Sequence, residues 1–265
     1  MEIWVQPTMT SKTNKPVKAK LLPDDPFFPL IQDAYRVFKR PKPSNIEVCE
    51  GCCMEPDIEA DFFHPPIQEL PLHYLQDWFF AASDPGGIAK NTWAYLLPRV
   101  LEVLACGEEV SSVGIEVSLS RYPTGQARNW SSEEWRVLDD FQKRFLLKAI
   151  EGGSEECLDD TLCMFRLGGW PMDGLLAQVA AVKTATLAER FWQDWCYGYA
   201  PSVWITAFWE SPDGTAAFDF YTSEVMYRRM QQLAFDDGTP PELSEKALMV
   251  AEVIEANATW NQPDQ

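Results

Sequence analysis

The sequence has no long apolar run and comparatively few basic residues. No stretch of the 265 residues approaches the roughly 18 consecutive apolar residues of a membrane-spanning helix, so we expect no such helix. Lysine and arginine total 22 against 40 aspartate and glutamate residues, which gives a formal net charge of −18. An acidic surface repels phosphate backbones, so we do not expect a nucleic-acid-binding protein.

The N-terminus lacks the basic segment and the apolar run of a signal peptide. The seven cysteines are an odd number, which favours reduced thiols over a framework of disulfides. Together these two observations predict a cytoplasmic protein.

Histidine is scarce, with only His64 and His73 in the chain. A Ser-His-Asp or Cys-His catalytic arrangement must therefore use one of these two residues. The sequence also has no Gly-x-Ser-x-Gly, no Gly-rich phosphate loop with Lys-Ser/Thr and no His-Glu-x-x-His. These absences favour a protein that is not an enzyme.

Large apolar side chains are abundant. Hydrophobic residues make up 46% of the chain and aromatic residues 13%, including 11 tryptophans and 15 phenylalanines. Disordered chains lack such a composition, so we expect a folded protein with a sizeable core. The length fits one large domain or two small ones.

Apolar residues recur at spacings of three and four through most of the chain, which predicts helices. Ser131, followed by Glu134, forms the capping-box pattern that begins a helix. Pro98 is expected to kink or divide the helix that contains it. Residues 113–119 alternate like a strand, but no partner strand is apparent, so strand and helix both stay open. Helices are expected at residues 28–38, 71–82, 89–105, 131–149, 159–167, 174–195, 223–235 and 241–258, with a turn at 211–214.

The predicted fold class is mainly α. We expect an irregular helical domain of about seven to nine helices, and helix pairs of about 40 residues leave helical-repeat-like pairing open. Residues 1–25 are polar and basic near the N-terminus, which predicts a flexible basic arm. Residues 26–265 would form a single helical domain that could divide near residue 150.

The tightest group of cysteines is Cys49-Glu-Gly-Cys52-Cys53. A Cys-x-x-Cys loop can hold zinc because it places two thiolates on one side of a turn, and a closed structural site needs four ligands. Cys53, His64 and His73 are the local candidates to complete a site with Cys49 and Cys52, and Cys53 and His64 are the preferred two. Incidental reduced thiols and a redox pair are the alternatives, although the irregular, proline-rich surroundings do not favour the redox interpretation.

The negative charge is unevenly distributed. Residues 1–45 hold eight basic and four acidic residues, whereas residues 46–265 hold 14 and 36, a net charge of −22. Residues 151–265 alone hold six basic and 19 acidic residues. Such a field attracts a basic partner, although acidic residues at solvated helix starts are the simpler explanation of each separate cluster. The candidate partner-binding residues are Glu155, Glu156, Asp159, Asp160, Asp236 and Asp237.

Four segments together resemble a loosely defined family of uncharacterised bacterial proteins. They are VCEGCC (48–53), LPLHYLQDWFFAASD (70–84), YLLPRVLEVLACG (95–107) and WSSEEWRVLDDFQKRF (130–145). The resemblance covers residues 46–150 and is weaker to about residue 235; Cys53 and the long N-terminal arm depart from the family pattern. It implies a bacterial, cytoplasmic, mainly helical protein, and it carries no known activity or catalytic residue.

Three functions follow as hypotheses. The first is an acidic cytoplasmic protein that binds and neutralises a basic protein partner, such as an immunity protein against a secreted bacterial toxin. The second is a zinc-stabilised structural or regulatory module that uses the Cys49 and Cys52 loop. The third is a hydrolase that acts through carboxylates or through a cysteine with His64.

Overall fold

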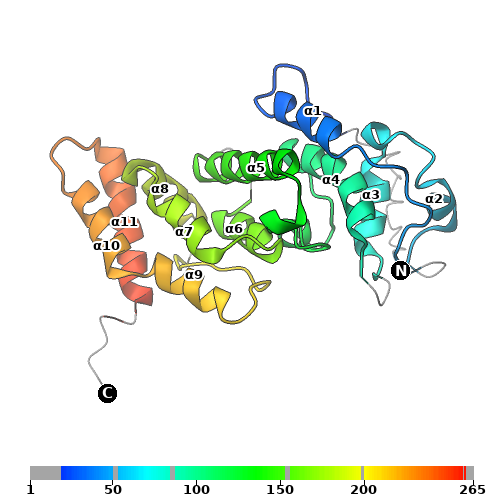
Figure 1. The fold of residues 1–265 in the computed structure, drawn as a ribbon. Helices are drawn as coiled ribbons and strands as arrows, with labels where there is room; N and C mark the ends of the chain where they lie inside the picture. Colours follow the sequence, from blue (N-terminus) through cyan, green and yellow to red (C-terminus); the bar gives the residue numbers. More distant parts are fainter. Residues whose placement is uncertain are drawn as a thin grey trace, which may run out of the picture.

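A computed structural model of the chain describes residues 19–49, 53–83, 87–152, 156–197, 200–258 and 260. The structure is mainly helical, as predicted, and no strand occurs among the described residues. Figure 1 shows an elongated arrangement in which α2 and α3 lie at one end and α10 and α11 at the other. The helices are α1 (Phe28–Val37), α2 (Pro56–Asp61), α3 (Leu72–Phe80), α4 (Lys90–Ala105), α5 (Ser132–Ile150), α6 (Leu158–Leu167), α7 (Met172–Ala180), α8 (Thr184–Phe191), α9 (Asp213–Tyr221), α10 (Glu224–Ala234) and α11 (Pro241–Asn257). The short helical segments are η1 (Ile67–Glu69), η2 (Ile115–Val117), η3 (Ala127–Asn129) and the π-helical η4 (Trp192–Cys196).

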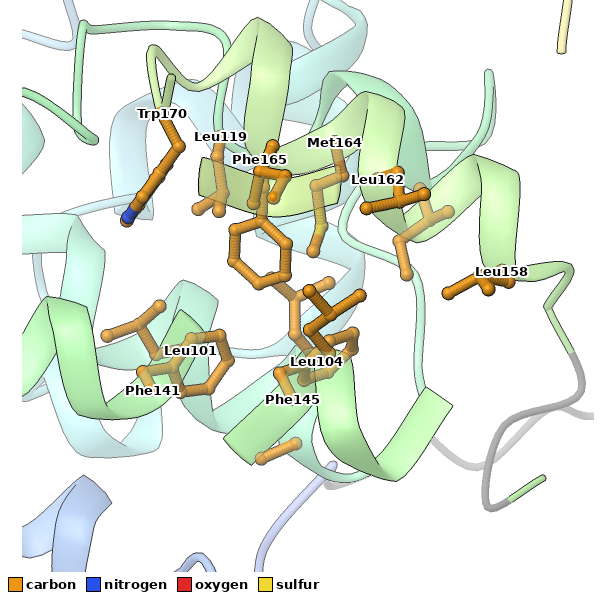
Figure 2. Packing of buried hydrophobic residues seen from close by; sticks show 14 of the residues in the cluster. Leu101, Leu104, Leu119, Phe141, Phe145, Leu158, Leu162, Met164, Phe165 and Trp170 are labelled. Atoms are coloured by element: carbon orange, nitrogen blue, oxygen red, sulfur yellow. The ribbon is translucent and has the colours of Figure 1, made fainter. Parts of the chain in front are cut away.

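The buried apolar side chains of the described residues form a cluster that extends from Ala19 to Ile254. Where α5 packs on α6, the rings of Phe145 and Phe165 meet edge to face, with centroids 6.0 Å apart. Figure 2 shows these two rings together with Phe141 of α5 and the leucines of α4. Aromatic rings of this size bury large apolar areas, so this contact stabilises the packing of the two helices.

Helix α4 shows why Pro98 does not interrupt the fold. The helix runs from Lys90 to Ala105 with Pro98 inside it, so the expected division does not occur. Proline removes one backbone hydrogen bond from a helix interior. Here, however, nearly every α4 residue from Thr92 onward is buried, including Trp93 and Leu97, and this packing outweighs the lost bond.

Helix α5 begins at the predicted capping box. The Ser131 hydroxyl accepts a hydrogen bond from the Glu134 backbone N–H at 3.3 Å, and the Glu134 carboxylate accepts from the Ser131 N–H at 2.8 Å. Two N–H groups that the helix itself leaves unpaired are thereby satisfied. Glu134 also forms an ion pair with Arg40, which ties the start of α5 to the segment after α1.

We expect Ser131→Ala to lower the free energy of unfolding by about 1 kcal/mol, because the substitution removes the helix cap. Ser132→Ala is the matched control, since Ser132 is exposed and is the first residue inside the helix. Urea denaturation followed by tryptophan fluorescence measures both variants. Equal stability of the two variants would contradict a capping role for Ser131.

Residues 113–119, for which strand and helix both stayed open, contain the 3₁₀ turn η2, which follows Gly114 with a φ of 145°. One predicted helix is wrong. The single helix predicted for residues 174–195 is three pieces: α7, α8 and η4. The periodic apolar residues continue across the break between α7 and α8 because both helices bury one face in the same core. Val179 of α7 and Leu187 of α8 are both completely buried. Periodicity alone therefore did not reveal the break.

Two helices were not predicted. α9 begins at Asp213, where the sequence predicted only a turn, and α2 lies in the proline-rich segment that looked irregular. Both are short, so they carry few periodic apolar residues from which a helix could be recognised.

Part of the segment predicted as a flexible arm contacts the helical body. The Ala19 carbonyl accepts a hydrogen bond from Arg99 Nη1 at 2.6 Å, and Leu21 is buried. Ala19 and Leu21 are therefore held against the helical body. The rest of the predicted arm, residues 1–18, lies outside the described residues.

Candidate functional site

The C-terminal helices α10 and α11 pack side by side at one end of the molecule (Figure 1). The Ser223 hydroxyl caps α10 by accepting from the Met226 N–H at 3.2 Å, and Pro241 occupies the first turn of α11. Met230 and Val250 are among the fully buried residues of this pair. The two helices and their connection, residues 224–257, are called the C-terminal hairpin below.

The turn of the C-terminal hairpin carries an exposed aromatic ring beside two carboxylates. Phe235 is 71% exposed, and Asp236 and Asp237 that follow it are also exposed. Asp236 Oδ1 accepts a hydrogen bond from the Gly238 N–H at 2.9 Å, which holds the turn in shape. Within the described part of the chain, neither aspartate forms an ion pair. The tip therefore presents an apolar ring and two uncompensated negative charges.

The outer face of α11 extends this negative surface. Glu245 and Glu252 are exposed and, among the described residues, lack an ion-pair partner. Glu242 pairs with Lys246 at 2.9 Å, and this contact lowers the pKa of the Glu242 carboxyl. Residues that recur at spacings of three, four and seven lie on the same side of a helix. The carboxylates of Glu242, Glu245 and Glu252 therefore lie together on the side of α11 that faces away from the core.

The acidic cluster predicted around residue 158 is not an exposed patch. Asp159 and Asp160 are buried at the start of α6, and Glu156 is half-buried beside a cavity of about 260 Å³. Glu155 lies outside the described residues. A partner that touches the surface would not reach Asp159 or Asp160, so their assignment to a binding surface is corrected.

Asp159 and Asp160 instead belong to a buried network with Glu116. Asp159 Oδ2 accepts from the Thr206 N–H at 2.7 Å and from Trp209 Nε1 at 2.8 Å. The Thr206 hydroxyl donates to Glu116 Oε1 at 2.5 Å. The network joins η2, the start of α6 and the segment before α9. Sequence analysis missed Glu116 and Thr206 because they lie far from α6 along the chain and match no motif.

Burial and like charge shift the acidity of this network. Burial raises the pKa of Asp159 to about 6. The pKa of Asp160 is raised to about 8. Burial is the largest cause, followed by the negative charge of Glu116 and a hydrogen bond with its carboxyl group. The raised pKa of Asp160 favours the protonated form of this carboxyl near neutral pH.

The predicted zinc ligands do not form a site in the described residues. Cys49 is disulfide-bonded, and Cys52 lies outside the described residues. Cys53 is half-buried, and the side chain of His64 is 73% exposed with Nδ1 3.2 Å from Asp61 Oδ1. No group of three or more metal-ligating side chains occurs in the part of the chain that the structure describes. A disulfide sulfur is not a thiolate ligand, so zinc binding remains a prediction for the reduced protein.

The thiols near the helices are poor nucleophiles. Burial raises the pKa of Cys106 and Cys196 to about 11 and that of Cys157 to about 12. Cys163 is completely buried, and its pKa is raised as well. A protonated thiol does not attack a substrate, which agrees with the expectation that these residues act as small apolar side chains.

A comparison of the chain with protein-family models, curated proteins and solved structures finds no match. The resemblance to a bacterial family therefore stays a prediction. Among the helices of the described residues, none combines the length and apolar character needed to cross a membrane.

Proposed function

We propose that the protein binds a basic protein partner through the tip and outer face of the C-terminal hairpin, and that covering this partner neutralises it. An immunity protein that protects a bacterial cytoplasm from a toxin works in this way. The observation that carries the proposal is the exposed ring of Phe235 beside the unpaired Asp236 and Asp237.

The proposed surface combines two contributions to binding. An exposed aromatic ring supplies apolar area that a partner can bury, and such rings are frequent binding hot spots. The carboxylates around it attract a basic surface and accelerate association. The acidic excess of residues 151–265 strengthens this attraction at distances up to about 10 Å in moderate salt.

Affinity capture from extract of the native host tests the proposal. We expect the wild-type protein to retain a basic protein that Asp236→Asn/Asp237→Asn fails to retain. Glu55→Gln/Asp57→Asn is the matched control, because it removes two exposed charges near α2 at the other end of the molecule (Figure 1). Loss of the gene should then sensitise cells to the captured protein.

We expect Phe235→Ala to weaken binding of the purified partner about 30-fold, because truncation of a hot-spot ring costs about 2 kcal/mol. The Asp236→Asn/Asp237→Asn variant should mainly slow association and reduce its dependence on salt. Surface plasmon resonance at several salt concentrations measures both effects. If the Glu55→Gln/Asp57→Asn control weakens binding as much as the hairpin variants do, the attraction is diffuse and the proposed surface is wrong.

A further inference from the structure

An aromatic pair lies beside the acidic helix α11. Helix α8 packs against α11 (Figure 1), and η4, which continues α8, packs there as well. η4 begins with Trp192, and Tyr197 follows its last residue. The two rings meet edge to face, with centroids 6.1 Å apart and an angle of 71° between their planes. Tyr197 is 82% exposed, more than any other large apolar side chain among the described residues, so its ring is open to a partner.

A cation of the protein itself is held where this pair meets α11. Lys246 Nζ lies over the face of the Trp192 ring, 5.1 Å from the centroid. The same ammonium pairs with Glu242 Oε1 at 2.9 Å. The hydrogen bond with Glu242 raises the pKa of Lys246, and the negative charge of Glu189 acts in the same direction. An aromatic face and carboxylates are the two groups that attract a cationic side chain, and the position of Lys246 shows that they do so here.

These contacts form a continuous strip from the start of α11 to the exposed ring. Glu242 pairs with Lys246, and Lys246 lies over Trp192. Trp192 in turn meets the ring of Tyr197. The side chain of Glu242 is 82% exposed and that of Lys246 is 21% exposed, so solvent reaches the carboxylate as well as the cation. Glu242, Lys246, Trp192 and Tyr197 are called the aromatic strip below.

We propose that the aromatic strip binds an arginine side chain of the basic protein partner, which takes the place of Lys246 between Glu242 and Trp192. The inference rests on the proposed function for the partner and names the group by which this partner is recognised. A planar guanidinium stacks on aromatic rings and matches a carboxylate with two parallel hydrogen bonds. The ammonium of Lys246 is a strongly hydrated point charge on a flexible stem, so it can leave the ring and return to water. Tyr197 then adds a second aromatic surface beside the bound guanidinium.

The aromatic rings separate this site from a diffuse acidic surface. Carboxylates alone attract arginine and lysine to a similar degree, because both side chains carry one positive charge. Stacking on Trp192 and Tyr197 favours the guanidinium over the ammonium. Preference for arginine over lysine is therefore the property that the aromatic strip predicts and that the negative charge of the protein does not.

Titration of the full chain with acetylated, amidated triarginine tests this proposal. Proton–nitrogen NMR follows the tryptophan indole N–H signals at physiological salt, which screens diffuse attraction. The Trp192 signal is assigned from its loss in Trp192→Phe. We expect a saturable shift of this signal, and about threefold weaker binding of trilysine with the same end groups. The signal of Trp78, which is buried in α3 at the other end of the molecule (Figure 1), should not move.

Removing the internal cation should strengthen binding. Lys246→Ala uncovers the face of Trp192 and removes the competing charge, so we expect triarginine to bind about fivefold more tightly. Alanine favours the helix, and the melting temperature checks that the variant is folded. Lys183→Ala is the matched control, because Lys183 is an exposed lysine at the start of α8 outside the aromatic strip. Its effect measures the change in overall charge alone.

Removing the exposed ring should weaken binding. Tyr197→Leu keeps an apolar side chain but has no aromatic face, and we expect about threefold weaker binding of triarginine. Tyr197→Phe keeps the ring and should bind like the wild type. Phe80→Leu is the matched control, since Phe80 is a 68% exposed ring at the end of α3, and it should leave the affinity unchanged.

Three results would overturn the proposal: no shift of the Trp192 signal at millimolar triarginine, equal affinity for trilysine, or equal effects of Lys246→Ala and Lys183→Ala. The titration is independent of the capture experiment. A shift of Trp192 that obeys these expectations, together with failure to capture a basic protein, would contradict the proposed function and leave the arginine site in place.

Discussion

Replacing Arg190 with alanine is expected to lower the free energy of unfolding by about 3–5 kcal/mol, the usual cost of breaking a buried ion pair. The Arg190 side chain is 1% exposed and pairs through two nitrogens with the Asp194 carboxylate, with Nε at 2.9 Å. Its guanidinium also donates to the carbonyls of Ala149 at 3.2 Å and Glu156 at 2.8 Å. One side chain thus joins α8 to the end of α5 and to the segment before α6. Truncation leaves a buried carboxylate and two carbonyls without this donor.

Arg228→Ala is the control for this prediction. Arg228 is exposed on α10 and pairs with Glu224 one turn away, an arrangement worth about 0.3–0.5 kcal/mol. Urea denaturation of both variants gives the comparison. The double variant Arg190→Met/Asp194→Leu should recover part of the loss, because it removes both buried charges. An Arg190→Ala loss no larger than that of Arg228→Ala would show that the buried pair does not hold the helices together.

The contribution of Asp159 and Asp160 to stability should fall as pH rises from about 4 to about 8. The ordinary pKa of an aspartate is 3.8, whereas Asp159 has a pKa of about 6 and Asp160 one of about 8 in the fold. The folded protein therefore holds protons that the unfolded chain has already lost. This stabilisation is fully present below pH 3.8 and disappears as pH passes each raised pKa. One pKa unit corresponds to about 1.4 kcal/mol, so we expect a loss of about 2 kcal/mol between pH 6 and 8.

Asp160→Asn tests the origin of this slope. In the wild type, Asp160 Oδ2 accepts a hydrogen bond from the Cys157 N–H at 3.2 Å. Asparagine stays neutral at every pH, and its side-chain oxygen can accept the same hydrogen bond. The variant should show a much shallower decline of unfolding free energy between pH 6 and 8 and should exceed the wild type in stability at pH 8. Asp173→Asn, at an exposed position in the first turn of α7, should leave the slope unchanged. A wild-type slope retained in Asp160→Asn would place the titration elsewhere.

The local sequence was sufficient for the fold class and for several helix boundaries. Ser131 and Glu134 mark the start of α5 because a capping box involves only residues three apart. The turn that carries Asp236 and Asp237 follows from the two apolar-periodic segments on either side of it. A cap is an interaction within one turn, so a single sequence is enough to infer it where the motif is present, as at the start of α5.

Burial depends on residues that are distant in the sequence, and only the tertiary structure decided it. Clustered acidic residues look alike in the sequence whether solvent or protein surrounds them, so Asp160 and Asp236 gave the same signal. The fold covers Asp160 because Glu116, 44 positions earlier, converges on the start of α6. The same long-range packing stacks Trp135 on Trp170. The sequence by itself therefore determined a helical, strongly acidic protein, while the tertiary structure decided which acids are exposed, because exposure is set by contacts between segments.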